Sequence, residues 1–200
     1  AAEIGFVTDT GQMVVKENGR VVVDAPAKQL AEDAPLYIRE EKRPAYLDAL
    51  KPVRVQDLPP TGDLNAALLK VLDSPTVASK EWIYRQYDHM VGTATVVLPG
   101  SDASVIRIKG TDKFIAMSTD CNATYCYLDP YEGGKIAVAE AARNVVCSGA
   151  TPLSVTDNLN FGNPMKPEVF WTFRKAIEGI RDACLKFETP VSGGNVSFYN

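Results

Sequence analysis

Polar residues that could bind a metal or a phosphate occupy positions 118–122, Ser-Thr-Asp-Cys-Asn. Asp120 follows an apolar stretch here and has hydroxyl and amide neighbours. A carboxylate in this setting at the end of a strand suits Mg²⁺, which binds one or two carboxylates together with phosphate oxygens. Aspartate, asparagine and serine are also ordinary turn residues and helix caps, so a purely structural turn is the alternative.

A second polar segment, residues 156–164, reads Thr-Asp-Asn-Leu-Asn-Phe-Gly-Asn-Pro and follows an apolar stretch. It combines one acid, Asp157, with three amides around Gly162, and Pro164 stops any helix there. Polar groups at the end of a hydrophobic strand commonly bind ligands. We expect either a ligand-binding loop or an ordinary connection at this point.

The third segment, residues 192–197, reads Ser-Gly-Gly-Asn-Val-Ser. Paired glycines allow the backbone to approach a ligand closely, and consecutive N–H groups can cradle a phosphate. The spacing matches neither the Walker A loop nor the dinucleotide-binding glycine pattern. A plain glycine turn is therefore the alternative to a phosphate-binding loop.

His89 is the single histidine of the chain and stands next to Asp88. This pair could form a poised acid–base group, or it could be a hydrogen-bonded structural histidine. One histidine excludes a His-rich metal site. The four cysteines have no Cys-x-x-Cys spacing, so free thiols are expected rather than a cysteine metal site.

Hydrophobic periodicity predicts the elements that position these segments. Two helices are expected to begin at capping residues: one over residues 64–72 after Asp63, and one from Ser79 to residue 87. Two longer helices are expected over residues 134–148 and 168–187. Strands are expected over residues 93–97, 104–108, 114–118, 153–156 and 191–192. The pattern predicts an α+β fold, a mainly antiparallel sheet with long helices covering one face.

The N-terminal part reads differently. Asn18-Gly19 between β-branched runs predicts a hairpin, and a further short strand is expected at residues 4–7. Residues 25–63 are rich in proline and carry a mixed charge run, which is typical of a linker laid over a surface. We therefore predict a boundary between a hairpin-plus-linker part, residues 1–62, and a main domain, residues 63–200.

Composition excludes several classes of function. The chain has 200 residues, with 21 basic and 25 acidic side chains, which argues against a dedicated nucleic-acid binder. It contains no apolar run long enough to span a membrane, and its first residues show no secretory signal. A cytoplasmic protein that binds neither nucleic acid nor membrane is expected.

Taken together and in this order, the polar segments resemble those of one known family, the synthetase subunit of phosphoribosylformylglycinamidine synthase. The resemblance covers most of the chain from about residue 79 and extends more loosely to residues 4–8 and 33–35. It is carried by residues 102–105 (Asp-Ala-Ser-Val), 119–122 (Thr-Asp-Cys-Asn), 134–144 (Gly-Lys-Ile-Ala-Val-Ala-Glu-Ala-Ala-Arg-Asn), 156–164 and 192–200 (Ser-Gly-Gly-Asn-Val-Ser-Phe-Tyr-Asn).

The resemblance implies a fold and a place in a larger enzyme. The family consists of tandem N-type and C-type halves of the aminoimidazole ribonucleotide synthetase kind. By this resemblance, residues 1–62 are the tail of a C-type domain plus a linker, and residues 63–200 are most of the second N-type domain. The chain is then expected to be a middle fragment of a longer ligase of purine biosynthesis.

The resemblance also implies the chemistry and the partners. The family enzyme uses ATP, Mg²⁺ and ammonia from glutamine to convert formylglycinamide ribonucleotide into its amidine. Its partners are a glutaminase subunit and a small bridging subunit. Motif by motif, Asp157 and Gly194 fall on ATP contacts, Asn195 on a Mg²⁺ ligand and Ser197 on a contact to the ribonucleotide.

His89 departs from the family pattern, because no tyrosine stands three residues after it. The catalytic histidines and most metal carboxylates are therefore expected in the missing first half, and the isolated chain is expected to be inactive, with no catalytic residue of its own. Two alternatives remain open: an auxiliary module that holds a nucleotide for assembly, or another enzyme of the same superfamily. Asp120 and His89 stay weaker candidates for the site.

Overall fold

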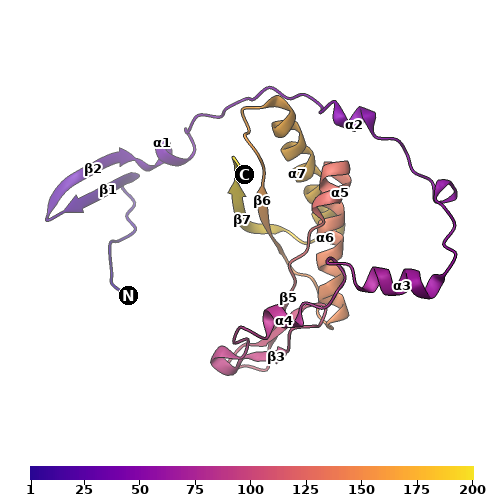
Figure 1. Cartoon of the computed structure of the whole chain (residues 1–200). Coiled ribbons are helices and arrows are strands. Elements are labelled where there is room, and N and C mark those ends of the chain that lie inside the picture. The colour runs from indigo at the N-terminus through magenta and orange to yellow at the C-terminus, as the bar shows by residue number, and fades with distance from the viewer. The chain divides into compact units, whose positions relative to one another are not determined.

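A β-hairpin dominates the first of the two units into which the chain divides, Ala1–Arg39 and Glu40–Asn200, and a computed structural model describes all 200 residues (Figure 1). Strand β1 (Gln12–Glu17) pairs antiparallel with β2 (Arg20–Pro26), and the short helix α1 (Ala27–Ala31) follows. Asn18 and Gly19 both have positive φ, 49° and 78°, as a two-residue hairpin turn requires. The predicted hairpin is confirmed.

The predicted strand at residues 4–7 is wrong, because this segment has no strand to pair with. The side chains of Ile4 and Val7 are fully exposed. A β-branched run forms a strand only where another strand supplies the ladder of hydrogen bonds and an apolar face to pack on.

Short elements open the second unit. They are α2 (Tyr46–Ala49), the 3₁₀ turn η1 (Val55–Asp57), α3 (Leu64–Leu72), α4 (Glu81–Tyr84) and the 3₁₀ turn η2 (Val91–Thr93). Asp63 caps α3 as predicted, since its Oδ1 accepts hydrogen bonds from the backbone N–H groups of Asn65 and Ala66 at 2.9 and 3.1 Å. The predicted boundary at residue 62 lies inside this second unit, whose division from the first falls after Arg39.

Helix α4 is shorter than predicted. It ends at Tyr84 instead of Tyr87, although Ser79 does accept a hydrogen bond from the Glu81 N–H at 3.2 Å. After Tyr84 the backbone N–H of Gln86 donates a hydrogen bond to the Ile83 carbonyl, three residues back. The Gln86 side-chain amide donates to the Trp82 carbonyl at 2.6 Å. That side chain occupies the acceptor that a further α-helical turn would use.

The Pro-rich stretch lies along α7 (Pro167–Phe187) and α5 (Ala123–Leu128) over residues 40–49. The Lys42 N–H donates to the Pro167 carbonyl at 3.2 Å, and Pro44 and Leu47 are buried. Tyr46 stacks on Tyr127 of α5 with ring centroids 4.4 Å apart. These contacts bind this part of the linker to the helices.

Three short strands form an antiparallel meander close to the predicted positions. They are β3 (Thr95–Val97), β4 (Ser104–Arg107) and β5 (Phe114–Met117), in the order β3-β4-β5. Ala103 and Val105 are its buried side chains. The meander leads directly into the Asp120 segment.

Helix α6 (Pro130–Cys147) begins one turn before the predicted start at Gly134. Asp129 caps it by accepting a hydrogen bond from the Glu132 N–H at 3.0 Å, and Pro130 occupies the first turn, where proline is well tolerated. Helix α5 just before it was not predicted. Its cap is Asn122, whose Oδ1 accepts from the N–H groups of Thr124 and Tyr125 at 3.0 and 3.3 Å.

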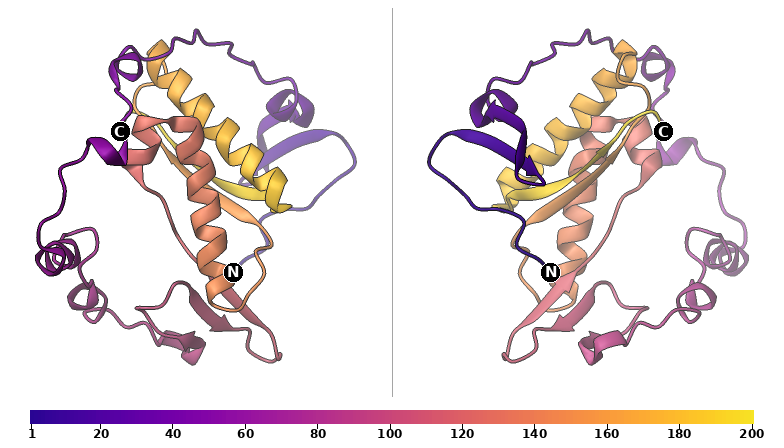
Figure 2. Two further views of the ribbon diagram at one scale, coloured as in Figure 1. Left: turned by 90° about the vertical axis from the view of Figure 1, so that its right-hand side faces the viewer. Right: turned by 90° about the vertical axis from the view of Figure 1, so that its left-hand side faces the viewer.

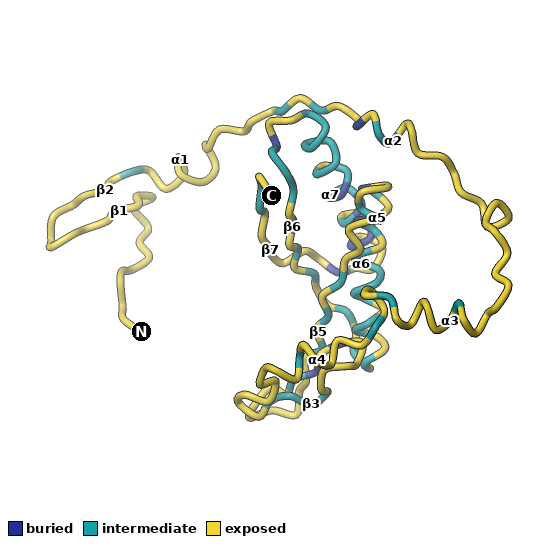
Figure 3. The backbone as a smooth tube through the Cα atoms, in the orientation of Figure 1, coloured by how far each residue is buried: buried dark blue, intermediate teal, exposed yellow.

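The core lies where α6, α7 and strand β6 (Val155–Asn160) meet. Val138, Ala183 and Cys184 are buried there, with Val155 and Ile180 packed against them. Figure 2 shows α6 and α7 side by side, with β6 and β7 (Val191–Ser197) on one side of them. Away from this core most of the chain is exposed (Figure 3), and no helix has the length and apolar character needed to cross a membrane.

The α+β class is confirmed, but the strands form three separate sheets, and the pair beneath the long helices is parallel. The predicted antiparallel character holds for the hairpin and for the β3-β4-β5 meander. Strands β6 and β7 are parallel because α7 connects them as a crossover helix.

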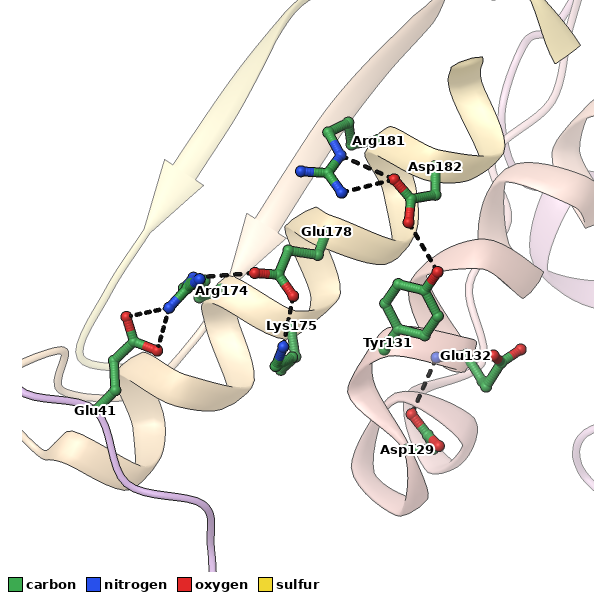
Figure 4. A network of polar contacts seen from close by, with 9 residues as sticks. All are labelled: Glu41, Asp129, Tyr131, Glu132, Arg174, Lys175, Glu178, Arg181 and Asp182. Carbon is green, nitrogen blue, oxygen red and sulfur yellow. Dashed lines mark hydrogen bonds and ion pairs between the residues drawn. The ribbon is translucent and has the colours of Figure 1, made fainter. Parts of the chain in front are cut away.

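Polar contacts tie the two long helices and the linker together (Figure 4). The Tyr131 hydroxyl on α6 donates to Asp182 on α7 at 2.8 Å, and Arg181 also pairs with Asp182. Further along α7, Arg174 bridges Glu41 of the linker and Glu178. The hydrogen bond from Tyr131, together with Arg181, holds the pKa of Asp182 below its usual range.

Acid should weaken the contact between α6 and α7. A carboxyl group with a depressed pKa stabilises the folded chain above its unfolded pKa, about 3.9 for aspartate, and this contribution is lost as the pH falls through the folded pKa. The urea midpoint should therefore fall as the pH drops below about 4, and it should fall less steeply in Tyr131→Phe, which removes the main cause of the shift. Superimposable pH profiles for the two proteins would contradict this role of Tyr131.

Candidate functional site

Strands β6 and β7 bring the second and third polar segments side by side. Asp157 pairs with Gly194, Asn158 with Asn195, and Asn160 with Ser197. The four residues carried over from the family motifs therefore lie on two neighbouring parallel strands. Both segments were expected to be loops at strand ends. This is wrong for residues 192–197, which lie within β7, and for residues 156–160, which lie within β6, whereas residues 161–164 do follow the end of β6 as a loop.

The side chains of β6 alternate between the two faces of this pair. Asp157 and Leu159 point towards α7, where Leu159 is buried, and the Phe161 ring that follows packs edge-on against Phe173 of α7 at 5.2 Å. Asn158 and Asn160 point to the opposite, exposed face. The expected ATP contacts, Asp157 and Gly194, thus share the helix-facing side.

An amide cluster occupies the exposed face. The side chain of Asn160 donates to the Asn158 Oδ1 at 3.2 Å, and that of Asn195 approaches the same oxygen at 3.5 Å. Ser197, paired with Asn160, lies on this face as well. The expected Mg²⁺ ligand and the expected ribonucleotide contact are therefore together, on the side away from Asp157.

Gly194 is needed where it stands, because Asp157 leaves no room for a side chain. A Cβ on Gly194 would lie 2.5 Å from the backbone oxygen of Asp157 and would also meet its carboxylate. A Cβ on Gly193 would meet nothing within 4 Å. Of the two glycines, only the second permits close approach, and what it approaches is the acid of the site.

A groove of about 610 Å³ opens beside Asp157, between the strands and α7. Its walls are mostly apolar, with Leu159, Ile177 and Ile180 among them. Its polar lining residues are Asp157, Arg181, Glu188 and Thr189. Such a surface can hold a flat apolar ring whose polar edge meets a carboxylate.

Asp120 is hydrogen-bonded to α6 and within its own turn, and each of its carboxylate oxygens accepts a hydrogen bond. One of its oxygens accepts from the Asn144 amide of α6 at 2.9 Å, and the other accepts from the Ser118 hydroxyl. Ser118 also contacts the Ala141 carbonyl of α6 at 3.2 Å. These contacts describe a structural anchor of the turn, and Asn144, 24 residues along the chain, could not be identified as a partner from sequence spacing.

His89 is exposed, in the turn before η2, and the structure gives its imidazole no hydrogen-bond partner. The neighbouring Asp88 does not face it, because the Asp88 carboxylate accepts a hydrogen bond from the Met90 N–H at 2.7 Å. The His89 backbone oxygen accepts from the Thr95 hydroxyl at 2.5 Å. Neither alternative for His89 is therefore seen: its imidazole is not paired with Asp88, and it is not a hydrogen-bonded structural histidine.

The chain is similar to a known protein family and to curated relatives. The family model described as AIR synthase related protein, N-terminal domain, matches residues 100–200. The PurL subunit of phosphoribosylformylglycinamidine synthase from Moorella thermoacetica is 56% identical over 200 residues, 100% of this chain and 27% of the relative. The chain thus spans about a quarter of the length of that curated relative.

Solved structures of Thermotoga maritima PurL are similar to this chain. The PurLQS structure matches with a TM-score of 0.65 and 29% identity, over 96% of this chain and 29% of the other. PurL complexed with ATP matches at 0.60 and 30%, over 96% and 28%. PurL complexed with FGAR matches at 0.59 and 30%, over 94% and 27%.

Proposed function

Because the chain belongs to the AIR synthase related protein family, we propose that it forms a nucleotide-binding part of a phosphoribosylformylglycinamidine synthase. The family resemblance seen in the sequence is confirmed. The proposed reaction of the whole protein is ATP-dependent conversion of formylglycinamide ribonucleotide to its amidine with ammonia from glutamine. The observation that carries the proposal is the pairing of Asp157 with Gly194 and of Asn158 with Asn195 on adjacent strands.

In the proposed site, the two faces of the strand pair have different tasks. Asp157 and the close backbone of Gly194 contact ATP beside the apolar groove, which suits a nucleobase. Ser197, on the amide face, donates a hydrogen bond to the ribonucleotide. A polar face and an apolar groove on one pair of strands allow two different ligands to be held a short distance apart.

The oxygen atoms of the amide face fit Mg²⁺ if they supply only one or two of its ligands. Asn195 and Asn158 offer neutral oxygens, and no three His, Cys, Asp or Glu side chains of the chain gather closely enough to form a metal site by themselves. Mg²⁺ usually keeps several waters and binds phosphate oxygens with only one or two protein ligands. When bound, the ion would neutralise phosphate charge, and Asn195 would hold it beside the substrate-binding Ser197.

We further propose that this site is completed by elements outside the chain. A folded monomer of 21.7 kDa exposes about 9200 Å². This chain exposes 15928 Å². Parallel strands are ordinarily covered on both faces, yet the amide face and the outer edges of β6 and β7 are open. The partners proposed are the rest of the synthase polypeptide, a glutaminase subunit and a small bridging subunit, in the cytoplasm.

Calorimetric titration of Mg-ATP into the purified chain tests the proposal. Micromolar binding that Asp157→Ala weakens at least tenfold, about 1.4 kcal/mol, would support a nucleotide site on these strands. Ser154→Ala is the matched control, because it changes a residue just before β6 and leaves the paired positions intact. Equal affinities for the parent chain and Asp157→Ala would refute the assignment of Asp157.

If the chain binds no nucleotide alone, the same titration on the complete synthase subunit with Asp157→Ala decides the question. Weakened binding there would support a site completed by other elements, whereas unchanged binding and activity would contradict the proposal.

A second candidate function is an auxiliary module that holds a nucleotide without turning it over. It is favoured by the exposed, unpartnered imidazole of His89, the single histidine of the chain. Retention of ADP through purification, with no ATP hydrolysis in the presence of formylglycinamide ribonucleotide, is expected from such a module. Turnover by the chain alone would exclude it.

A further inference from the structure

Two thiols face each other at the beginning of α5. The Sγ atoms of Cys121 and Cys126 are 3.9 Å apart. Cys121 stands just before the cap residue Asn122, and Cys126 stands one turn into the helix, where its N–H donates the first helical hydrogen bond to the Asn122 carbonyl at 3.2 Å. The first turn of α5 therefore sets the distance between the two sulfur atoms.

Helix α6 holds both ends of this pair. On the Cys121 side, the preceding residue Asp120 accepts a hydrogen bond from Asn144 of α6 at 2.9 Å. On the Cys126 side, the backbone packs directly on Gly133 of α6, where a Cβ would lie 2.5 Å from the Cys126 Cα. The two thiols are thus positioned by the same helix, and their proximity does not depend on a free loop.

The other two cysteines lack such a partner. Cys147 is exposed at the end of α6, and Cys184 is buried in the core. Within the close pair, Cys121 is exposed and open to a small oxidant. Cys126 is half-buried, and burial, together with the neighbouring Cys121, raises its pKa to about 11. Cys121 is therefore the sulfur that an oxidant reaches first.

We propose that Cys121 and Cys126 form an intramolecular disulfide when the chain meets a peroxide, which makes the beginning of α5 a site of reversible oxidation. This inference does not rest on the proposed function. A disulfide needs the sulfurs about 2.05 Å apart, so the two sulfur atoms must approach by about 1.9 Å. The bond would fasten the Asp120 turn to the body of α5.

The oxidation balances with one peroxide. The Cys121 thiolate attacks a peroxide oxygen, the O–O bond breaks, and one water leaves after protonation, so that Cys121 becomes a sulfenic acid. The Cys126 sulfur then attacks the Cys121 sulfur, the S–O bond breaks, and a second water leaves with the Cys126 proton. Two thiols lose two electrons in total, and hydrogen peroxide is reduced to two waters.

Peptide mapping after exposure to hydrogen peroxide tests the proposal. Trypsin releases both cysteines in one peptide, residues 114–135, so the disulfide appears as a loss of two hydrogens from that single peptide. Because the second step is intramolecular, disulfide formation in this peptide should be at least about tenfold faster than at Cys147, and independent of protein concentration. In urea this advantage should shrink, since α6 no longer positions the pair.

Variants identify the order of events. Cys126→Ser should accumulate the Cys121 sulfenic acid, trapped by dimedone, and Cys147→Ser should form the disulfide at the parent rate. A peptide that keeps both thiols while Cys147 oxidises would overturn the proposal. So would disulfides that join Cys121 to a second molecule, or an unchanged rate advantage in urea.

Discussion

Gly179→Ala is expected to destabilise the chain by about 2–3 kcal/mol, although alanine normally stabilises a helix interior by about 1 kcal/mol relative to glycine. The reason is the close approach of α7 to α6 at this residue. A Cβ on Gly179 would meet the Tyr131 backbone, with its carbonyl carbon 2.9 Å away, and the Lys135 N at 3.2 Å. Backbone atoms cannot turn aside as a flexible side chain can, so the helices must separate.

Separation of the helices would spread to the core. Gly134 faces Ala176 and Ile180 of α7 in the same close manner, and the buried Val138 lies one turn further along α6. Urea unfolding followed by circular dichroism measures the effect, with Gly62→Ala as the control, because a Cβ there meets nothing within 4 Å. A Gly179→Ala variant with the same urea midpoint as the parent would contradict the prediction, because the helices would then tolerate an added methyl group at their closest approach.

Caps and periodicity in the sequence predict α3 and the two long helices of this fold. Asp63 defines the start of α3, and the apolar stripe of α7 predicts a helix that begins within one residue of the observed start. The apolar pattern predicts the start of α6 a turn too late, although Asp129-Pro130 is itself a strong starting signal. Capping hydrogen bonds and nearby side chains set these helix boundaries, so the residues around each boundary are enough to predict it.

The strands of the candidate site could not be read in the same way. Asn158, Asn160 and Gly194 are poor strand formers, and by propensity both segments are loops. They become strands because each supplies the hydrogen-bonding partner of the other, across a separation that includes the whole of α7. This pairing is a tertiary effect, and so is the contact of Asn144 with Asp120. Motifs predict the residues of the candidate site. Which of them lie on the helix-facing side and which on the exposed face of the strand pair depends on the strand register.

Gly194→Ala is the second change expected to have a large effect. The new Cβ would press on the Asp157 carbonyl, 2.5 Å away, and on its carboxylate, so the strands must separate where the proposed nucleotide site lies. A loss of about 2 kcal/mol in stability is expected, as for other overpacked positions. Amide hydrogen exchange around β6 should become faster. Mg-ATP affinity, wherever the parent protein shows it, should fall at least tenfold, about 1.4 kcal/mol.

Gly193→Ala makes this test specific, because the neighbouring glycine has open space around its Cβ position. Alanine there should leave stability within about 0.5 kcal/mol of the parent and leave hydrogen exchange in β6 unchanged. The two variants add the same methyl group to adjacent residues of one strand, so a difference between them reports on Asp157 alone. Equal effects would mean that the pair of glycines serves chain flexibility. They would contradict the view that the close approach of Gly194 to Asp157 shapes the proposed nucleotide site.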